Sequence, residues 1–342
     1  MLRRGALPLL VILLAGTILL AVGVGTVGIP PGTTLRLLAW KIGLTGPPAG
    51  VPASTAVILF ELRIPRVVLA AVVGSALAVS GVVYQALFRN PMADPAIVGI
   101  SSGAALGAVA VILVAGGTLA GGLAVPVAAF GGALAVGFVV YRVARIGPSV
   151  QVATLLLAGI AMAAVISAVI SLVMAFSDEE IRSIYFWLLG GLAARGWEAV
   201  AAAGPLVVAG VAAALLTVRD LNLLALGEER AAQLGMEVER FKRVTLATGA
   251  LLTGAAVSVA GVIGFVGLMT PHILRLGLGA DHRRLLPASV LGGATFMVLA
   301  DLAARTLVAP SEVPVGAVTA LLGGPFFLYL LRRERRAAGA RA

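Results

Sequence analysis

Windows of about 20 consecutive apolar residues recur along almost the whole of this chain. A helix that crosses a bilayer needs about this length, because the hydrocarbon core is about 30 Å thick. Hydrophobic residues make up 60% of the 342 and charged residues 12%, so a soluble domain would lack polar side chains to cover itself. A membrane β-barrel would instead show short alternating segments. The sequence therefore predicts an all-α polytopic membrane protein.

The apolar windows predict about ten spans in a single transmembrane domain over residues 1–342. The first window is longer than the apolar part of a signal peptide and is interpreted as an uncleaved helix. The eighth is short and contains Pro271, which leaves open whether it crosses fully. A Pro- and Gly-rich loop is expected at 29–64, a polar stretch at 177–197 and a charged loop at 218–242. The windows are 7–28, 65–86, 96–115, 119–141, 152–175, 198–217, 243–264, 266–279, 285–306 and 313–331.

The basic residues predict the orientation, because cytoplasmic loops carry an excess of Lys and Arg. With the N-terminus in the cytoplasm, 18 of the 25 basic residues lie inside, and an even number of spans places the C-terminus there too. The formal charge of +10 follows from this bias, so no nucleic-acid partner is expected. The seven basic residues on the outer side are Arg36, Lys41, Arg63, Arg66, Arg182, Arg195 and Arg305.

The sequence lacks the residues that several kinds of chemistry require. There is no cysteine, and neither Lys41 nor Lys242 follows a glycine, so the chain has no GxxxxGK loop for ATP. Asp301 is the one acidic residue deep within a predicted span, which counts against an ion-coupled secondary transporter. A polytopic membrane enzyme would need a nucleophile, metal ligands or an acid–base pair at the interface, and no convincing set is present. Both classes remain the alternatives.

Three segments closely resemble hallmark regions of the FecCD-type permeases. They are LRIPRVVLAAVVGSALAVSGVVYQALFRNPMADPAIVGISSGA (62–104), GFVGLMTPHILRLGLGADHRRLLPAS (264–289) and LADLAARTLVAPSEVPVGAVTALLGGPFFLYLLRR (299–333). This family, which includes BtuC-like proteins, supplies the membrane subunits of ABC importers for vitamin B12, haem and iron–siderophores. The match covers most of the chain from about residue 57, in the family's order.

The resemblance implies a ten-helix permease in the cytoplasmic (inner) membrane that forms a homodimer around the transport pathway. Two ATP-binding subunits would bind inside and an extracytoplasmic substrate-binding protein would dock outside. The chain itself would carry no cofactor and catalyse no reaction, with ATP and Mg bound by the partner ATPase. Transport would proceed by alternating access, and the expected cargo is an iron–siderophore, then cobalamin or haem.

The charged loop LNLLALGEERAAQLGMEVERFKR (221–243) predicts a short rigid helix between Gly227 and Gly235. Such a helix suits docking into a partner's groove; the alternative is an ordinary solvated loop. In the family, the corresponding segment couples ATPase movement to the membrane helices. The resemblance therefore assigns coupling to Glu228, Glu229, Arg230, Gln233, Leu234 and Gly235.

The turn GPSVQVATLLLAG (147–159) lies at the inner end of the fifth predicted span. In the family this neighbourhood narrows the pathway toward the cytoplasm. Ser149, Gln151 and Thr154 are small or polar enough to serve as gate residues. Helix capping by Ser149 is the equally open alternative.

Arg63, Arg66 and Arg305 run against the positive-inside trend. The family docks acidic side chains of its binding protein onto arginines at matching positions, and exposed charge pairs of this kind set orientation and encounter rate. The alternative for the first two is snorkelling at the membrane interface. For Arg305 it is a pair with Asp301 four residues earlier.

The stretch LFRNPMADPAIVGISSGA (87–104) places charges and prolines together after the second span. Arg89, Asn90, Pro91, Asp94 and Pro95 are interpreted as a sharp cytoplasmic turn, which is also the family's signature. Asp94 is expected to favour the start of the next helix. Gly99, Gly103 and Gly107 would then let that helix pack closely against another helix of the chain.

The aromatic residues Tyr185, Phe186 and Trp187 suit the membrane interface of an outer helix in the stretch 177–191. His272, Arg275, Asp281 and His282 are interpreted as a hydrogen-bonded structural turn, and no metal site is expected.

Overall fold

The structure is a computed structural model that describes residues 2–25, 28–115, 122–147, 149–177 and 180–339. The first half contains α1 (Leu2–Gly23), α2 (Pro31–Lys41), α3 (Ala53–Val57), the π-helical η1 (Ile58–Arg63), α4 (Ile64–Leu87), the 3-10 segment η2 (Pro95–Val98), α5 (Ile100–Ala115) and α6 (Ala124–Ala144). The second half contains α7 (Val152–Ala175), α8 (Ile181–Leu188), α9 (Trp197–Leu216), α10 (Val218–Leu224), α11 (Glu228–Gln233), α12 (Val238–Ala260), α13 (Val266–Leu278), α14 (His282–Thr306) and α15 (Val315–Gly339). A short antiparallel hairpin of β1 (Arg145–Ile146) and β2 (Ser149–Val150) joins α6 to α7.

The helical membrane class is confirmed. Within the described ranges, eight helices are long and apolar enough to cross a membrane. The shorter α5 and α13 correspond to the third and eighth predicted windows, so the count of about ten is consistent with the structure.

The first predicted loop is wrong in detail. The segment 29–64 contains α2 and the helical run α3–η1, which continues into α4 as one 35-residue helix from Ala53 to Leu87. The apolar residues of 56–60 extend the second span outward, and Pro65 lies within this continuous helix directly after the π-helical segment η1. The segment 218–242 holds α10, α11 and the first turn of α12.

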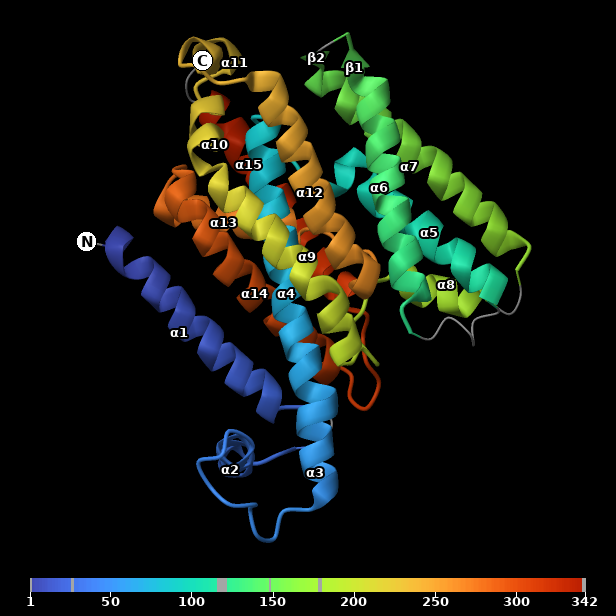
Figure 1. Cartoon of the computed structure of the whole chain (residues 1–342), viewed down its shortest axis with the longest axis vertical. Coiled ribbons are helices and arrows are strands. Elements are labelled where there is room, and N and C mark those ends of the chain that lie inside the picture. The colour runs from blue at the N-terminus through green and yellow to red at the C-terminus, as the bar shows by residue number, and fades with distance from the viewer. Residues whose placement is uncertain (1, 26–27, 116–121, 148, 178–179, 340–342) are drawn as a thin grey trace.

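Helix α4 runs through the middle of the bundle, with α9, α12, α13 and α14 around it (Figure 1). Close approach of the neighbours depends on glycines. A Cβ at Gly81 would run into the backbone of Gly267 in α13, and one at Gly74 would run into the backbone of Gly293 in α14. Small residues therefore let backbones touch where side chains would hold the helices apart.

Helices α5, α6 and α7 form a second group beside this bundle, with α8 below them in Figure 1. The predicted packing role of the glycines in α5 is confirmed, because a Cβ at Gly103 or Gly107 would meet the backbone of Gly132 or Ala128 in α6. By contrast, α7 buries only 17% of its most apolar window. Its exposed residues include Leu157, Ile160, Val165, Val169 and Leu172.

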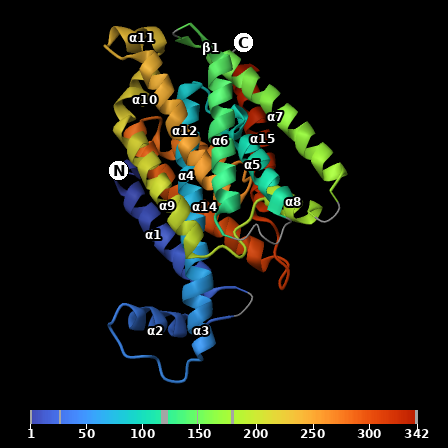
Figure 2. The ribbon, with the colours of Figure 1, turned by 45° about the vertical axis from the view of Figure 1, so that its right-hand side comes forward.

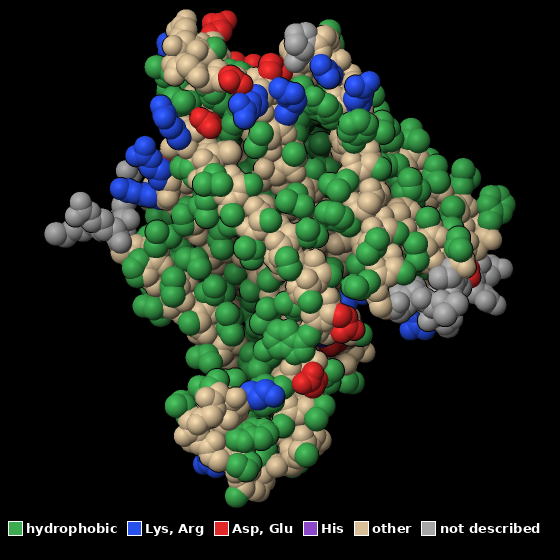
Figure 3. Space-filling view, viewed as in Figure 1, with side chains coloured by type: hydrophobic (Ala, Val, Ile, Leu, Met, Phe, Trp, Pro, Cys, Tyr) green, Lys and Arg blue, Asp and Glu red, His purple; other side chains and the backbone are tan. Residues whose placement is uncertain are grey.

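The two ends of the molecule differ. Helix α11 and the β1–β2 hairpin lie at one end, which the charge bias makes cytoplasmic, while α2 and α3 lie at the outer end (Figures 1 and 2). Lys and Arg side chains gather over the cytoplasmic end in Figure 3, and hydrophobic side chains cover the belt between the ends. This distribution fits a bilayer around the middle of the bundle.

Candidate functional sites at the two membrane faces

Helices α10 and α11, which make up much of the predicted coupling loop, are held to the membrane helices by polar contacts. Asn222 of α10 donates from Nδ2 to Asp281 Oδ1 at 2.9 Å, and its Oδ1 accepts the backbone N–H of His282 at 3.0 Å. Glu228 of α11 pairs with Lys242 of α12 at 2.7 Å. The short helix expected between Gly227 and Gly235 is present, and both glycines have positive φ (105° and 86°) that favours glycine.

The predicted coupling residues differ in their surroundings. Glu229, Arg230 and Gln233 are exposed, and Leu234 presents an apolar side chain that is 58% exposed at the cytoplasmic end. Glu228 instead points inward to Lys242. A ridge with an exposed apolar residue among charges is chemically suited to a protein partner. That role stays a prediction.

The gate candidates lie together at the β1–β2 hairpin and the start of α7. Capping of α7 by Ser149 is wrong, because Ser149 lies in β2 and its Oγ donates to the carbonyl of Ile146 at 3.1 Å. Gln151 occupies the N-cap position, and Thr154 donates to Gln151 Oε1 at 3.3 Å. Whether these three residues gate a pathway stays a prediction.

The signature turn folds back into the protein. Arg89 takes a left-handed conformation (φ 49°) directly after the C-cap of α4, and Asn90 Oδ1 accepts the N–H of Met92. Asp94 caps η2 through the N–H of Ala96 at 2.8 Å, so the 3-10 segment comes first and α5 begins only at Ile100, four residues later than predicted. Burial raises the pKa of the Asp94 carboxyl, and backbone hydrogen bonds from Ala96 and Phe265 oppose this rise. The turn thus connects α4, η2 and the start of α13.

The predicted structural turn is present at Asp281 and His282, which share Asn222, whereas Arg275 bonds to α4 and the ring of His272 packs against Phe326 of α15. His282 Nδ1 lies 2.7 Å from Asn222 Oδ1, and Arg275 donates to Gln85 Oε1 at 3.0 Å. Gln85 in turn donates to the carbonyl of Gly267 at 3.2 Å. Asp281 is the N-cap of α14, and the N–H of Arg283 and the amide of Asn222 hold the pKa of its carboxyl below the usual value.

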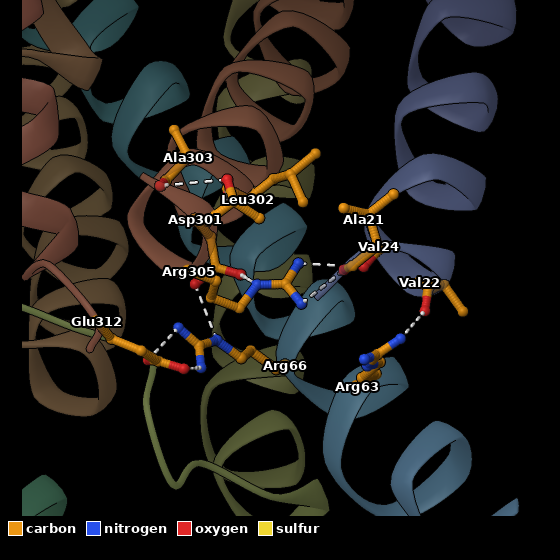
Figure 4. A network of polar contacts seen from close by, with 11 residues as sticks. Ala21, Val22, Val24, Arg63, Arg66, Asp301, Leu302, Ala303, Arg305 and Glu312 are labelled. Carbon is orange, nitrogen blue, oxygen red and sulfur yellow. Dashed lines mark hydrogen bonds and ion pairs between the residues drawn. The ribbon is translucent and has the colours of Figure 1, made fainter. Parts of the chain in front are cut away.

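On the outer side, four charged residues form the outer ion network, which is defined here as Arg66, Asp301, Arg305 and Glu312 (Figure 4). Arg66 Nε donates to Asp301 Oδ1 at 2.9 Å, and its other nitrogens bind Glu312 at 2.9 and 3.0 Å. Arg305 Nε lies 3.1 Å from Asp301 Oδ2 as an ion pair that lacks hydrogen-bond alignment. The i,i+4 alternative for Arg305 is therefore present in the structure.

Arg63 and Arg305 are buried, with 6% and 4% of their surfaces exposed. Snorkelling is wrong for Arg63, because its guanidinium binds the carbonyls of Val22 and Gly23 inside the protein. Arg63, Arg66 and Arg305 line one cavity of about 620 Å³ together with Arg195, Glu61, Glu198 and Glu312. Docking of a partner to these arginines stays a prediction.

Comparison with known proteins then identifies the family. A model of the FecCD transport family matches residues 11–333. The chain belongs to the FecCD transport family.

Three of its relatives are named as permeases of import or transport systems. The chain is 51% identical over 289 residues to the cobalamin import system permease protein BtuC of Halobacterium salinarum, covering 84% of this chain and 77% of that protein. It is 48% identical to the hemin transport system permease protein HmuU of Yersinia pestis (81% and 84% covered). It is 35% identical to the Fe(3+)-citrate import system permease protein YfmE of Bacillus subtilis (98% of both).

A solved structure described as an inward-facing conformation of a metal-chelate type ABC transporter superposes with a TM-score of 0.82 at 31% identity, covering 96% of this chain and 98% of that one. The FecCD chain is thus an ABC-type permease subunit and a multi-pass protein of the inner membrane.

Some residues of this FecCD permease carry contacts that the sequence did not single out. In the sequence, Lys242 is notable only as one of two lysines, neither of which belongs to a GxxxxGK loop. Nothing in the sequence draws attention to Asn222, Glu239 or Glu312. A signal for Lys242 was available, since a lysine three residues after a glutamate at the start of an apolar helix predicts a pair on one helix face. Asn222 and Glu312 find their partners 59 and 246 residues away. Contacts at such separations leave no local pattern.

Proposed function

We propose that this chain is the translocating subunit of an ATP-driven importer for a metal chelate or corrinoid. Two copies would enclose the pathway, two separate ATP-binding subunits would dock at α11, and an extracytoplasmic binding protein would deliver the cargo. Movement would follow alternating access. The observation that carries the proposal is the exposed coupling helix α11, which polar contacts join to α12 and, through α10, to α14, in a chain of the FecCD family.

The cargo belongs to a class that the relatives' names suggest. Cobalamin and hemin name the relatives with 51% and 48% identity, and ferric citrate names one with 35%. Cobalamin and haem are therefore the first cargoes to test, ahead of the iron–siderophore that the sequence alone favours. A cavity of about 360 Å³ between α5 and α7, with Ser101, Ser102, Ser167 and Ser171 in its lining, offers neutral hydroxyl groups to such a cargo.

The proposed homodimer would have an apolar face of α7 available to it. The exposed apolar residues of α7 need a cover, and lipid or a second copy of the chain can provide it. Mass measurement of the purified complex should give two copies of this chain with two ATPase subunits. A ratio of one copy per complex would contradict the dimer.

The deciding experiment is reconstitution in proteoliposomes. The chain would be purified with its cognate ATPase and binding protein, and uptake of cobalamin, haem and a ferric siderophore would be followed with and without ATP. We expect ATP-dependent uptake of one cargo and no ATP hydrolysis by the chain alone. Uptake driven by a proton or sodium gradient and indifferent to ATP would overturn the proposal.

Docking at the outer arginines has its own test. An R66E variant should bind the cognate binding protein at least tenfold more weakly, and a reversed charge on the facing acidic residue of that protein should restore binding. R36A in the exposed helix α2 is the matched control. Restoration would show direct pairing, whereas failure of every reversed acidic residue would place docking elsewhere.

A further inference from the structure

The side chain of Lys242 joins three elements of the cytoplasmic end. It extends from α12, is only 5% exposed, and its Nζ reaches Glu228 Oε2 of α11 at 2.7 Å and Glu239 Oε1 at 3.0 Å. The third contact is the carbonyl of Val150 in β2 at 3.2 Å. An ammonium group has three hydrogens to donate, and here each has an acceptor.

Glu239 completes the attachment of the hairpin. Its Oε2 accepts the backbone N–H of Val150 at 2.8 Å, while Lys242 binds the carbonyl of the same residue. Two side chains that lie three residues apart on α12 therefore hold both backbone groups of Val150. This fixes the β1–β2 hairpin against α12, although the hairpin and α12 are about 90 residues apart in sequence.

Val150 lies directly before the start of α7. Gln151 is the N-cap of α7, and its N–H binds the carbonyl of Ala144 at the end of α6. Helix α7 is mostly exposed along its length. The contacts of Val150 therefore fix the cytoplasmic end of α7 relative to α12. A shift of Val150 is thus passed to α7 at the point where the gate candidates lie.

The chemistry of the contact favours joint movement. A buried ammonium that loses one of its two carboxylate partners keeps its charge in a poorly solvated place, with Glu239 as its one remaining countercharge, which is costly. Glu228 therefore cannot move away from Lys242 without a penalty, whereas Lys242, Glu239 and Val150 can follow it together. By comparison, the nearby pair of Arg240 and Glu237 is exposed and 3.7 Å apart, so it can separate with little effect.

We propose that Lys242 is a positioning residue that passes the movement of α11 to the β1–β2 hairpin and the start of α7. The inference rests on the proposed function, in which α11 docks the ATPase. In that scheme a displacement of α11 moves Glu228, and Lys242 moves with Glu228. Val150, which is bound to Lys242, then shifts the start of α7.

The test measures cargo transported per ATP hydrolysed by the reconstituted complex. K242M removes all three contacts at similar length, E228Q weakens only the link to α11, and R240M is the matched control on the same helix. We expect K242M to retain ATP hydrolysis within about twofold while transport per ATP falls at least tenfold. E228Q should give a smaller fall, and the double variant should be no worse than K242M, because both changes break one connection.

Failure of the proposed function and failure of the positioning role of Lys242 give different results. If the wild-type complex shows no ATP-dependent uptake, the proposed function itself fails before any variant is compared. If K242M or E228Q assembles and transports with a ratio within twofold of the wild type, or if R240M falls equally, the positioning role is overturned. If K242M does not assemble, the E228Q result decides the matter.

A second readout follows the hairpin directly. The chain has no cysteine, so labels can be attached at introduced cysteines in place of Ala232 in α11 and Ile146 in β1, both exposed. In the otherwise unchanged chain the label separation should stay narrowly distributed with and without ATP. E228Q should broaden it in the ATP-bound complex, and an unchanged distribution would contradict the inference.

Discussion

Arg63 and Arg305 come from different helical segments and together bind the four consecutive carbonyls at the C-terminal end of α1. Arg63 Nη1 donates to Val22 and Gly23 at 3.2 and 2.9 Å, and Arg305 donates to Ala21 and Val24 at 3.1 and 3.4 Å. The last carbonyls of a helix lack intrahelical partners and carry partial negative charge. Two buried arginines on the outer side, against the positive-inside trend, thus have a structural role in holding α1.

The first prediction concerns R305A. Breaking a buried ion pair costs roughly 3–5 kcal/mol, and because Arg66 still neutralises Asp301 we expect the lower end of this range. The apparent melting temperature of the detergent-purified protein should fall by several degrees, and hydrogen exchange at residues 20–25 should rise. R36A, in the exposed part of α2, should change neither. Unchanged exchange in R305A would show that the contacts of Arg305 are not needed to hold the end of α1.

The second prediction contrasts the two acids of the outer ion network. Asp301 is 1% exposed between Arg66 and Arg305, whereas Glu312 is 34% exposed. D301N would leave two buried guanidinium groups facing each other. We therefore expect it to lower the melting temperature clearly more than E312Q does. The free energy of unfolding should fall by about 3 kcal/mol in D301N and by less than about 1 kcal/mol in E312Q. Thermal unfolding followed by tryptophan fluorescence would compare them. Equal effects would mean that solvent reaches Asp301.

These contacts illustrate what the sequence could and could not predict. Apolar windows and charge bias predict the membrane class and orientation, because span length and positive-inside bias are read from consecutive residues. The pair of Asp301 and Arg305 is also predicted as an alternative, since four residues bring them onto one helix face. The contacts of Arg63 with α1 span 40 and 41 residues. No local rule indicates which carbonyls a distant arginine will reach.

The helix ends show the same limit. The segment 29–64 is rich in Pro and Gly, which predicts a loop, yet residues 53–63 are helical because they continue the buried helix α4. Likewise the signature turn is predicted as a turn, but its 3-10 segment depends on Asp94 and on contact with the start of α13. Tertiary contacts therefore decided what propensity alone left open. The predicted position at the membrane interface is wrong for Trp187, because its side chain is buried in the protein (8% exposed).

The third prediction concerns G81A at the contact of α4 with α13. A Cβ there would overlap the backbone of Gly267, so the helices would have to separate or the contact would fail. We expect a large loss of monodisperse protein after detergent extraction. G131A is the matched control, because Gly131 lies on an exposed part of α6, and no atom lies within 4 Å of the place that its Cβ would take. Alanine there should be neutral or slightly stabilising. Equal yields of the two variants would contradict the packing account.

The fourth prediction concerns pH and the N-cap of α14. The pKa of Asp281 is held below its usual value by the N–H of Arg283 and the amide of Asn222. A depressed carboxyl pKa contributes stability that is present above the unfolded pKa, near 4, and is lost as pH falls through the lower folded value. D281A should therefore cost about 1 kcal/mol at pH 7 and reduce the loss of stability on acidification.

D281N separates the charge from the cap. The asparagine oxygen can still accept the N–H of Arg283, so D281N should retain most of the stability at pH 7 but lack the acid-dependent part. Melting temperatures of the three proteins between pH 3 and pH 7 would check this. Because Asp281 also anchors α10 through Asn222, D281A should increase hydrogen exchange in residues 218–224. If D281A and the parent protein lose stability in parallel on acidification, another carboxylate carries the effect.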